Sequence, residues 1–193
     1  MMRGILLILF LLPASYAQTA LLDEWLVVEE RMESVACCSA YTGAADKNLA
    51  AQNVRLVFSP SEVVHVIKRE GNKFLVQGYA SDVSAWLDKP KLVATTSFQP
   101  LSEWSGQSHF EISSVDSGQV YKIAKNATFT ASFDDNHEPR KWTGRLYKYK
   151  QLIWAKPNGD RTGFSAWSVF QLKEDGTICI LNFDTANSEP PCE

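Results

Sequence analysis

The densest group of metal-binding or acid–base side chains in the sequence is the run 134–138. It combines carboxylates with an imidazole: Asp134, Asp135, His137 and Glu138. Hard cations bind carboxylate oxygens, so Asp134, Asp135 and Glu138 form a hypothetical cation site. The run lacks the spaced ligands and the glycine of a Ca²⁺-binding loop, however, and polar runs of this kind are typical of solvated turns. We therefore predict no metal and no cofactor.

The other reactive side chains do not have the spacing of a catalytic site. Neither His65 nor His109 has a Ser, Cys or carboxylate at a recognisable triad spacing. Ser165 follows Gly163 at the spacing of a nucleophile elbow, but the second glycine of that motif is absent. A hydrolase whose carboxylates cannot be paired from the sequence is an alternative. The sequence favours a non-catalytic binding protein.

Aromatic side chains are the more informative group, with six Trp, six Tyr and ten Phe. Inward-facing rings of a β-domain can line a cavity for an apolar ligand, and outward-facing rings can form a platform for sugar rings or a protein partner. Two Trp are expected on the face of their strand opposite its main apolar set, and two Tyr form a further candidate pair. The predicted ligand-binding residues are Tyr147, Tyr149, Trp154 and Trp167.

Two binding hypotheses follow from these rings. In the first, a barrel interior lined by Phe129, Phe133 and Phe170 holds a small apolar molecule. In the second, exposed aromatics bind a carbohydrate or another protein, for instance as an inhibitor. The predicted partner is therefore a small apolar ligand, a carbohydrate or a protein.

These residues must be positioned by β-strands, in which successive side chains point to opposite faces of the sheet. The segment 145–155 alternates with period two and is expected to form one strand, followed by a turn at 157–160 that contains Asn-Gly. Strands at 164–172 and 177–183 follow, separated by the turn 174–176. Further upstream, 127–133 has the clearest alternation, with Ala and Phe on one face and Thr and Ser on the other.

About ten short strands separated by turn signals predict a mainly β protein, a single antiparallel β-barrel or β-sandwich. Near the N-terminus, the segment 20–36 is ambiguous between helix and strand. Apolar residues recur at three- and four-residue steps from Leu21 to Val35, which favours a short helical segment in its later half, whereas the β-branched and aromatic run 25–28 is also typical of a strand. The segment 39–52 is expected to be a loop that leads into a short helix, and 81–90 a loop or a turn of helix.

Four cysteines, Cys37, Cys38, Cys179 and Cys192, predict up to two disulfide bonds in an exported chain. A bond between the adjacent Cys37 and Cys38 would close a strained ring. We therefore favour the two pairings that connect this pair to Cys179 and Cys192. A zinc site is not favoured, because adjacent cysteines cannot readily bind one ion.

The N-terminal segment predicts export. Arg3 precedes the apolar run 5–12, and Ala14 and Ala17 form a small-residue cleavage site, so 1–17 is expected to be a cleaved signal peptide. The apolar run is shorter than the roughly 20 residues of a membrane span. Residues 18–193 are then expected to form a single β-rich domain that is secreted or periplasmic, with no membrane span after cleavage.

The charge distribution argues against nucleic acid as a partner. The formal net charge is −3, and the basic residues are scattered along the chain. Their densest groups, Arg140-Lys141 and Lys148 with Lys150, are expected to lie on solvated strand faces. Asn126 begins an Asn-Ala-Thr sequence, which is a glycosylation acceptor in a eukaryotic host.

The segment 23–28, with Trp25 followed by three apolar residues, is similar to the Trp-bearing first strand of lipocalins. A secreted β-protein of this size is typical of that family. Asp23 stands where lipocalins have Gly, and their later loop motifs are absent, so we assign the chain to no family.

Overall fold

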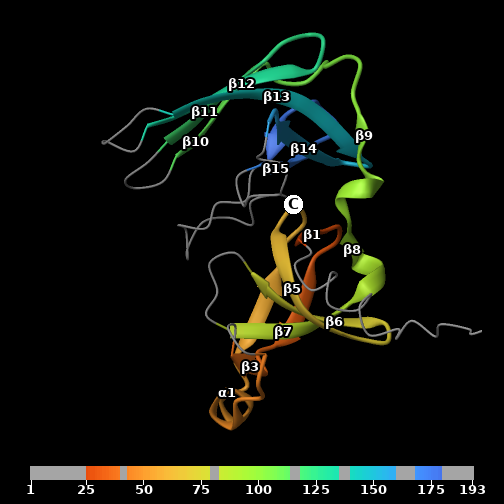
Figure 1. Cartoon of the computed structure of the whole chain (residues 1–193), viewed down its shortest axis with the longest axis vertical. Helices are drawn as coiled ribbons and strands as arrows, with labels where there is room; N and C mark the ends of the chain where they lie inside the picture. Colours follow the sequence, from red (N-terminus) through yellow and green to blue (C-terminus); the bar gives the residue numbers. More distant parts are fainter. Residues whose placement is uncertain are drawn as a thin grey trace, which may run out of the picture.

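Antiparallel strands make up most of the chain in the computed structural model, which describes residues 25–39, 43–78, 83–113, 118–134, 140–159 and 168–179 (Figure 1). The strands form a six-stranded sheet, an eight-stranded curled sheet and a two-stranded sheet. In Figure 1 the curled sheet lies above the six-stranded sheet, and the segment from β8 to β9 connects them on one side. The predicted mainly β class is confirmed.

The six-stranded sheet has the order β3-β7-β6-β5-β1-β8. Its strands are β1 (Trp25–Val28), β3 (Cys38–Ser39), β5 (Val63–Glu70), β6 (Lys73–Gly78), β7 (Val83–Asp88) and β8 (Leu92–Val93). Gly71, at φ 57°, supplies the left-handed conformation that the tight β5–β6 turn requires. The two-stranded sheet pairs β2 (Met32–Val35) with β4 (Arg55–Phe58), and the helix α1 (Lys47–Gln52) precedes β4.

The curled sheet is a meander in which seven strands follow one another in chain order, and it is nearly closed into a barrel. These strands are β10 (His109–Ser113), β11 (Gly118–Ile123), β12 (Thr128–Asp134), β13 (Arg140–Tyr149), β14 (Leu152–Pro157), β15 (Val169–Leu172) and β16 (Ile178–Cys179). The short β9 (Gln99–Pro100) pairs with the end of β13. Two 3₁₀ turns, η3 (Lys89–Lys91) and η4 (Thr95–Ser97), lie in the connection between the sheets.

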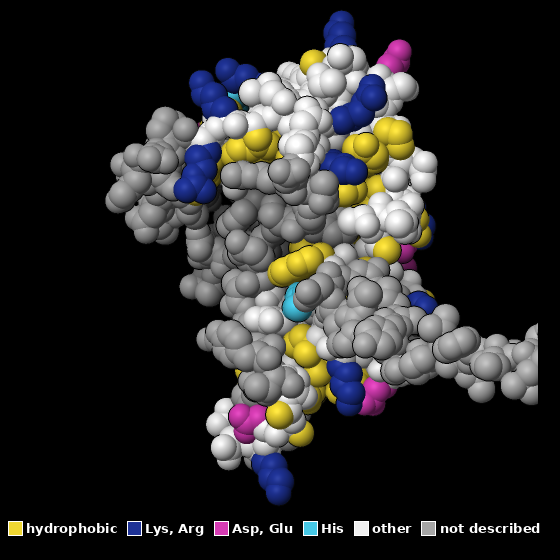
Figure 2. Space-filling model, in the orientation of Figure 1, with side chains coloured by type: hydrophobic (Ala, Val, Ile, Leu, Met, Phe, Trp, Pro, Cys, Tyr) yellow, Lys and Arg dark blue, Asp and Glu magenta, His cyan; other side chains and the backbone are white. Residues whose placement is uncertain are grey.

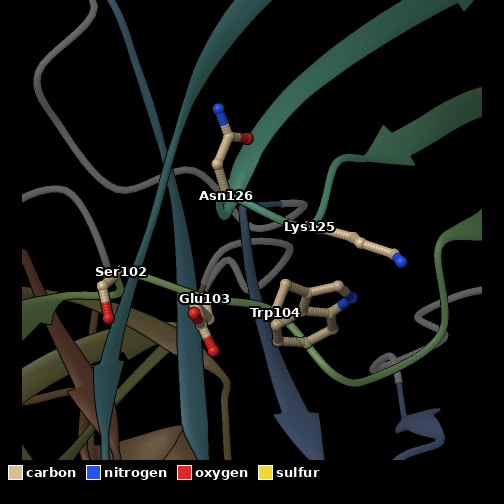
Figure 3. Close-up of a pocket in the computed structure, with 5 residues that line it drawn as sticks. All are labelled: Ser102, Glu103, Trp104, Lys125 and Asn126. Carbon is tan, nitrogen blue, oxygen red and sulfur yellow. The ribbon is translucent and has the colours of Figure 1, made fainter.

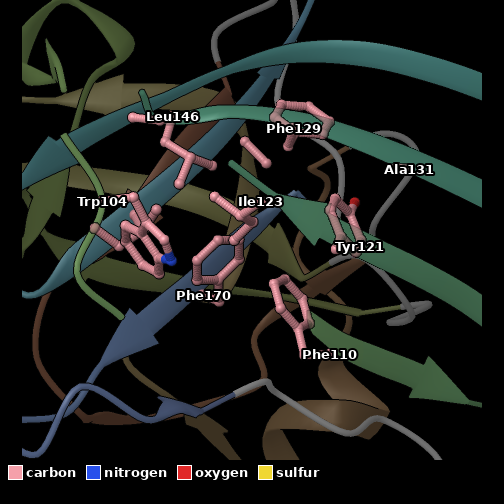
Figure 4. Packing of buried hydrophobic residues seen from close by; sticks show 11 residues of the cluster. Trp104, Phe110, Tyr121, Ile123, Phe129, Ala131, Leu146 and Phe170 are labelled. Atoms are coloured by element: carbon pink, nitrogen blue, oxygen red, sulfur yellow. The ribbon is translucent and has the colours of Figure 1, made fainter. Parts of the chain in front are cut away.

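Aromatic rings fill the concave side of the curled sheet (Figure 4). Phe110 stacks on Tyr121 with ring centroids 4.8 Å apart and meets Phe170 edge-on at 5.1 Å. Phe129 lies directly opposite Gly144, where a Cβ atom would come within 2.5 Å of the Phe129 ring. Glycine at this position therefore allows the ring to lie flat against the neighbouring strand.

A second apolar cluster joins the two large sheets. Val27, Val63 and Val93 of the six-stranded sheet pack against residues of β14 and β15: Leu152, Trp154 and Val169. An ion pair between Lys150 and Glu29 also connects the sheets at the β13–β14 turn. Among the described residues, the six-stranded sheet thus covers the end of the outer face formed by Leu152, Trp154 and Val169.

The N-terminal helix favoured for the later half of 20–36 is wrong over the described residues, because β1 and β2 occupy this segment, and the alternative of a strand at 25–28 is confirmed as β1. Val27 pairs with both Val63 and Val93, so hydrogen bonding to two neighbouring strands overrides the helical spacing. Val35, expected on the buried stripe, is 41% exposed. The short helix expected at the end of 39–52 is confirmed as α1, whereas 81–90 contains the strand β7 instead of a loop or helical turn.

The strand expected over 145–155 is in fact two strands with a turn at Lys150 and Gln151. Lys150 has φ 50°, a left-handed conformation that Gly or Asn usually adopts. Because neither residue occurs at this turn, the sequence gives no signal for it. The following turns agree with prediction: Gly159 and Gly176 both have positive φ. The signal peptide expected over 1–17 lies outside the described residues.

The predicted disulfide pairing is wrong for Cys37 and Cys38, which are bonded to each other. Ser84 of β7 holds the pair at the sheet edge: its carbonyl accepts a hydrogen bond from the Cys37 N–H (3.1 Å), and its hydroxyl donates to the Cys38 carbonyl (3.2 Å). Cys179 is also disulfide-bonded, but it lies in β16 of the curled sheet, whereas β3 is at the other end of the molecule (Figure 1). Cys192 lies outside the described residues.

Peptide mapping can test this connectivity. Trypsin would release 32–47, with Cys37 and Cys38, and a C-terminal peptide 174–193 that contains the other two cysteines. We expect the non-reduced peptide 32–47 to appear alone, lighter by two hydrogens than its reduced form, because the Cys37–Cys38 bond lies within it. A cross-linked species that joins 32–47 to 174–193 would contradict the adjacent pairing.

Candidate functional site

A pocket of about 420 Å³ lies where the curled sheet meets the connection from the other sheet. Its lining residues come from the η4 region, β13 and β14: Thr95, Thr96, Phe98, Tyr147, Trp154 and Lys156. Aromatic rings, two hydroxyls and one ammonium group therefore share one concavity. This composition is typical of a binding site with an apolar body and a few polar contacts.

Strand register brings the two main rings of the pocket together. Tyr147 and Trp154 are directly opposite each other on β13 and β14, and their ring centroids are 5.5 Å apart. Phe98, from the connection, meets Trp154 edge-on at 6.0 Å. Trp154 is only 3% exposed, whereas Tyr147 is half-buried. The rings thus form a rigid apolar floor that reaches the surface at Tyr147.

Lys156 places a positive charge beside this floor. It follows Trp154 by two residues on β14 and so lies on the same face of the sheet. Its Nζ atom is 5.3 Å from the ring centroids of both Tyr147 and Trp154, within the range of cation–π attraction. Thr95 and Thr96 also line the pocket and supply hydroxyl groups. The pocket can therefore hold a ring-shaped polar molecule by stacking, hydrogen bonding and charge.

The four predicted ligand-binding residues have different environments. Tyr147 and Trp154 line the pocket together, although Trp154 is buried and not the exposed platform expected from the sequence. Tyr149 is half-buried against the inter-sheet cluster and packs on Phe98 at 6.0 Å, outside the pocket lining. Trp167 lies outside the described residues.

Sequence reasoning did not identify Phe98, Lys156, Thr95 or Thr96 as site residues. Lys156 could have been found, because a residue two positions after Trp154 must share its strand face. The other three lie on a connection whose position against β13 and β14 is set by tertiary contacts, and no local pattern marks them.

A second pocket, of about 430 Å³, is lined by Ser102, Glu103, Trp104, Lys125 and Asn126 (Figure 3). Its polar side chains do not converge: Asn126 points away from Ser102 and Glu103, and Lys125 extends to another side. The Trp104 indole N–H donates to the Gln107 carbonyl at 2.9 Å, and its ring belongs to the core of the curled sheet. We therefore interpret this pocket as structural.

The remaining sequence candidates do not form a site in the described part of the chain. Within the described ranges, no three His, Cys, Asp or Glu residues are grouped as a metal site would require. Most of the acidic run, with Asp135, His137 and Glu138, lies outside those ranges. His65 packs against Trp25 at 4.9 Å, and His109 is exposed.

Comparisons with protein-family models, curated proteins and solved structures found no match. Among the described residues, no helix has the length and apolar character to cross a membrane.

One buried carboxyl lies outside the pocket, at the start of β5. Glu62 accepts a hydrogen bond from the Ser59 N–H (3.0 Å), and its backbone N–H and carbonyl bond to Ser59 and Val28. Burial raises the pKa of Glu62 to about 7, and the Ser59 hydrogen bond lowers it to a smaller extent. The folded protein therefore holds a proton on Glu62 at pH values at which the unfolded chain has lost it.

This shift predicts a stability loss as pH rises. The unfolded carboxyl loses its proton near pH 4.5 and the folded one near pH 7, so the free energy of unfolding falls across that window, by at most about 3 kcal/mol. We expect Glu62→Gln to remove this dependence and to stabilise the protein at pH 8 more than at pH 4.5, measured by urea unfolding. Glu70→Gln, on the exposed end of β5, is the control and should leave the slope unchanged. Parallel pH profiles for Glu62→Gln and the wild type would refute the assignment.

Proposed function

We propose that the protein is an exported, non-catalytic binding protein whose ligand is a carbohydrate held in the pocket lined by Phe98, Tyr147 and Trp154. We further propose that residues 18–193 act as one β-rich domain, because the apolar cluster between the large sheets buries side chains from both. Export is supported by the apolar N-terminal run and its small-residue cleavage site, and by disulfide-bonded cysteines.

The observation that carries the carbohydrate proposal is the packing of Tyr147 against Trp154 beside two threonine hydroxyls and Lys156. Sugar rings present C–H groups on their faces and hydroxyls at their edges. Aromatic rings match the faces, and Thr95, Thr96 and Lys156 match the edges. The described lining side chains are hydroxyl, aromatic and ammonium groups, without a carboxylate, an imidazole or a thiol among them, and this composition supports recognition of a sugar.

No specific observation favours the alternative of an apolar ligand inside the curled sheet. The Phe129 and Phe170 side chains, expected to line such a cavity, pack directly on Tyr121 and Phe110. Phe133 is half-buried, near the end of β12. The aromatic rings of this interior pack against one another. The pocket at the sheet junction, by contrast, opens to solvent at Tyr147 and Thr96.

Glycan binding by the purified secreted chain tests the proposal. We expect binding on a glycan array, and we expect Tyr147→Leu to weaken it roughly tenfold, because a ring stacked on a ligand contributes on the order of 1 kcal/mol beyond its buried area. Affinities would be measured by calorimetry.

Tyr149→Leu is the matched control for this experiment. Tyr149 lies two residues further along the same strand face and is equally half-buried, but it does not line the pocket. We expect its affinity to stay within about twofold of the wild type, with both variants folded by circular dichroism. An array without binding, or equal losses in both variants, would refute the carbohydrate site.

A further inference from the structure

We propose that the outer face of the curled sheet continues the pocket as a cationic strip and that the ligand is an acidic polysaccharide, which carries carboxylate or sulfate groups. The strip consists of Lys122, Lys141, Arg145 and Lys156. This inference rests on the proposed carbohydrate site and specifies the class of its ligand.

The strand register places these four residues on one face. Arg145 is directly opposite Lys156 on β14 and opposite Thr128 on β12. Directly opposed residues of antiparallel strands point to the same side, and so do residues two apart along a strand. Lys141 and Tyr147 are therefore on the Arg145 face, since each differs from it by an even number of positions.

Lys122 reaches the same face through two register steps. It lies opposite Thr130, which lies opposite Thr143. Thr143 is two residues from Arg145 and shares its side of β13. The concave side carries the alternate residues, including Tyr121, Phe129 and Leu146, all of which are buried in the core. Burial thus independently confirms which face looks outward.

The positive charges of this strip are available to a ligand. Lys122, Lys141 and Arg145 are exposed and Lys156 is half-buried, and none of the four has a salt-bridge partner within the described part of the chain. Glu111 is the acidic residue of this face among those with a described side chain. It lies on the edge strand β10, diagonal to Lys122 and far from the pocket, and it forms no ion pair with Lys122. Figure 2 shows more Lys and Arg than Asp and Glu around the upper sheet.

The dimensions of the strip favour a polymer. Arg145 and Lys156 are on adjacent strands, about 5 Å apart at the backbone, whereas Lys141 is four residues from Arg145, or about 13 Å along β13. Exposed threonine hydroxyls lie between the cations: Thr128, Thr130 and Thr143. Alternating ammonium, guanidinium and hydroxyl groups match a chain of sugar rings that carries an acidic group at intervals.

Other anionic partners fit the surface less well. A single-stranded nucleic acid would need several exposed rings along its path on which successive bases could stack, whereas Tyr147 is the half-buried ring at which the pocket reaches the surface and the strip itself contains no aromatic side chain. An anionic membrane favours clustered cations with apolar side chains that insert between them, whereas threonine separates the cations here. An acidic polysaccharide uses both the strip and the ring floor at its end.

The test compares oligogalacturonate, as the acidic probe, with a neutral gluco-oligosaccharide of equal length. We expect the wild type to prefer the acidic probe, with an affinity that falls as salt is raised. The double variant Lys122→Gln/Arg145→Gln should weaken acidic binding roughly tenfold at low salt and reduce the salt dependence. Lys148→Gln/Lys173→Gln removes the same charge from exposed sites outside the strip and should change the affinity by less than about twofold.

The outcomes distinguish failure of the cationic strip from failure of the carbohydrate pocket on which it rests. If both probes bind equally and Lys122→Gln/Arg145→Gln has no effect while Tyr147→Leu does, the strip is refuted and the carbohydrate pocket stands. If neither probe nor heparin binds, both proposals fail. Oligothymidylate or phosphatidylglycerol vesicles could instead bind more tightly than oligogalacturonate and lose this binding in the double variant. That result would show a cationic surface with a different partner and would overturn the proposal of an acidic polysaccharide.

Discussion

The apolar contact between the two large sheets is the interaction on which the rest of the structure depends. Val27, Val63 and Val93 cover Leu152, Trp154 and Val169, and all six side chains are almost fully buried. Burying an aliphatic side chain of this size contributes on the order of 2 kcal/mol. Without this contact, the outer face of the curled sheet would expose Leu152 and Trp154 to water, and the pocket would lose the wall that contains Phe98.

The same contact divides one sheet face into two chemically distinct parts. Along β13, alternate residues run from Lys141, Thr143 and Arg145 to Tyr147 and Tyr149, so the face changes from charged to aromatic where the second sheet begins to cover it. A pocket forms at this boundary. The segments that cover this face of the curled sheet end at the Thr95–Ser97 turn, whereas β13 continues beyond it. The position of the pocket therefore follows from where the two sheets stop touching.

Local patterns predicted the parts of this arrangement that depend on local chemistry. The alternation of Phe129 and Ala131 with threonines correctly predicts β12 and its buried face, and Gly176 correctly predicts a turn. The turn at Lys150 could not be predicted, because a lysine with positive φ is held there by strand pairing and by Glu29 and not by its own preference. Because the turn was not predicted, a single strand over 145–155 would place Tyr147 and Trp154 on opposite faces, although the two residues are directly opposite each other on β13 and β14.

The disulfide prediction was wrong for a related reason, because disulfide pairing depends on which segments become neighbours. Ring strain argued against a Cys37–Cys38 bond, but hydrogen bonds with Ser84 hold both residues at the edge of the six-stranded sheet, whereas β16 belongs to the curled sheet. Similarly, basic residues that are scattered in sequence come together when three strands align Lys122, Arg145 and Lys156.

A net charge of −3 describes the whole chain, but a ligand responds to the charges within about one Debye length of its own groups, roughly 10 Å at 0.1 M salt. Lys150 shows the contrast within the same sheet: its ammonium group is paired with Glu29, and this contact raises its pKa and fixes it in the inter-sheet contact. Arg145 and Lys156 have no such partner in the described chain, and they lie beside the rings of the pocket. Strand register therefore places Lys150 in the contact between the sheets, whereas it places Arg145 and Lys156 on the face that carries the pocket.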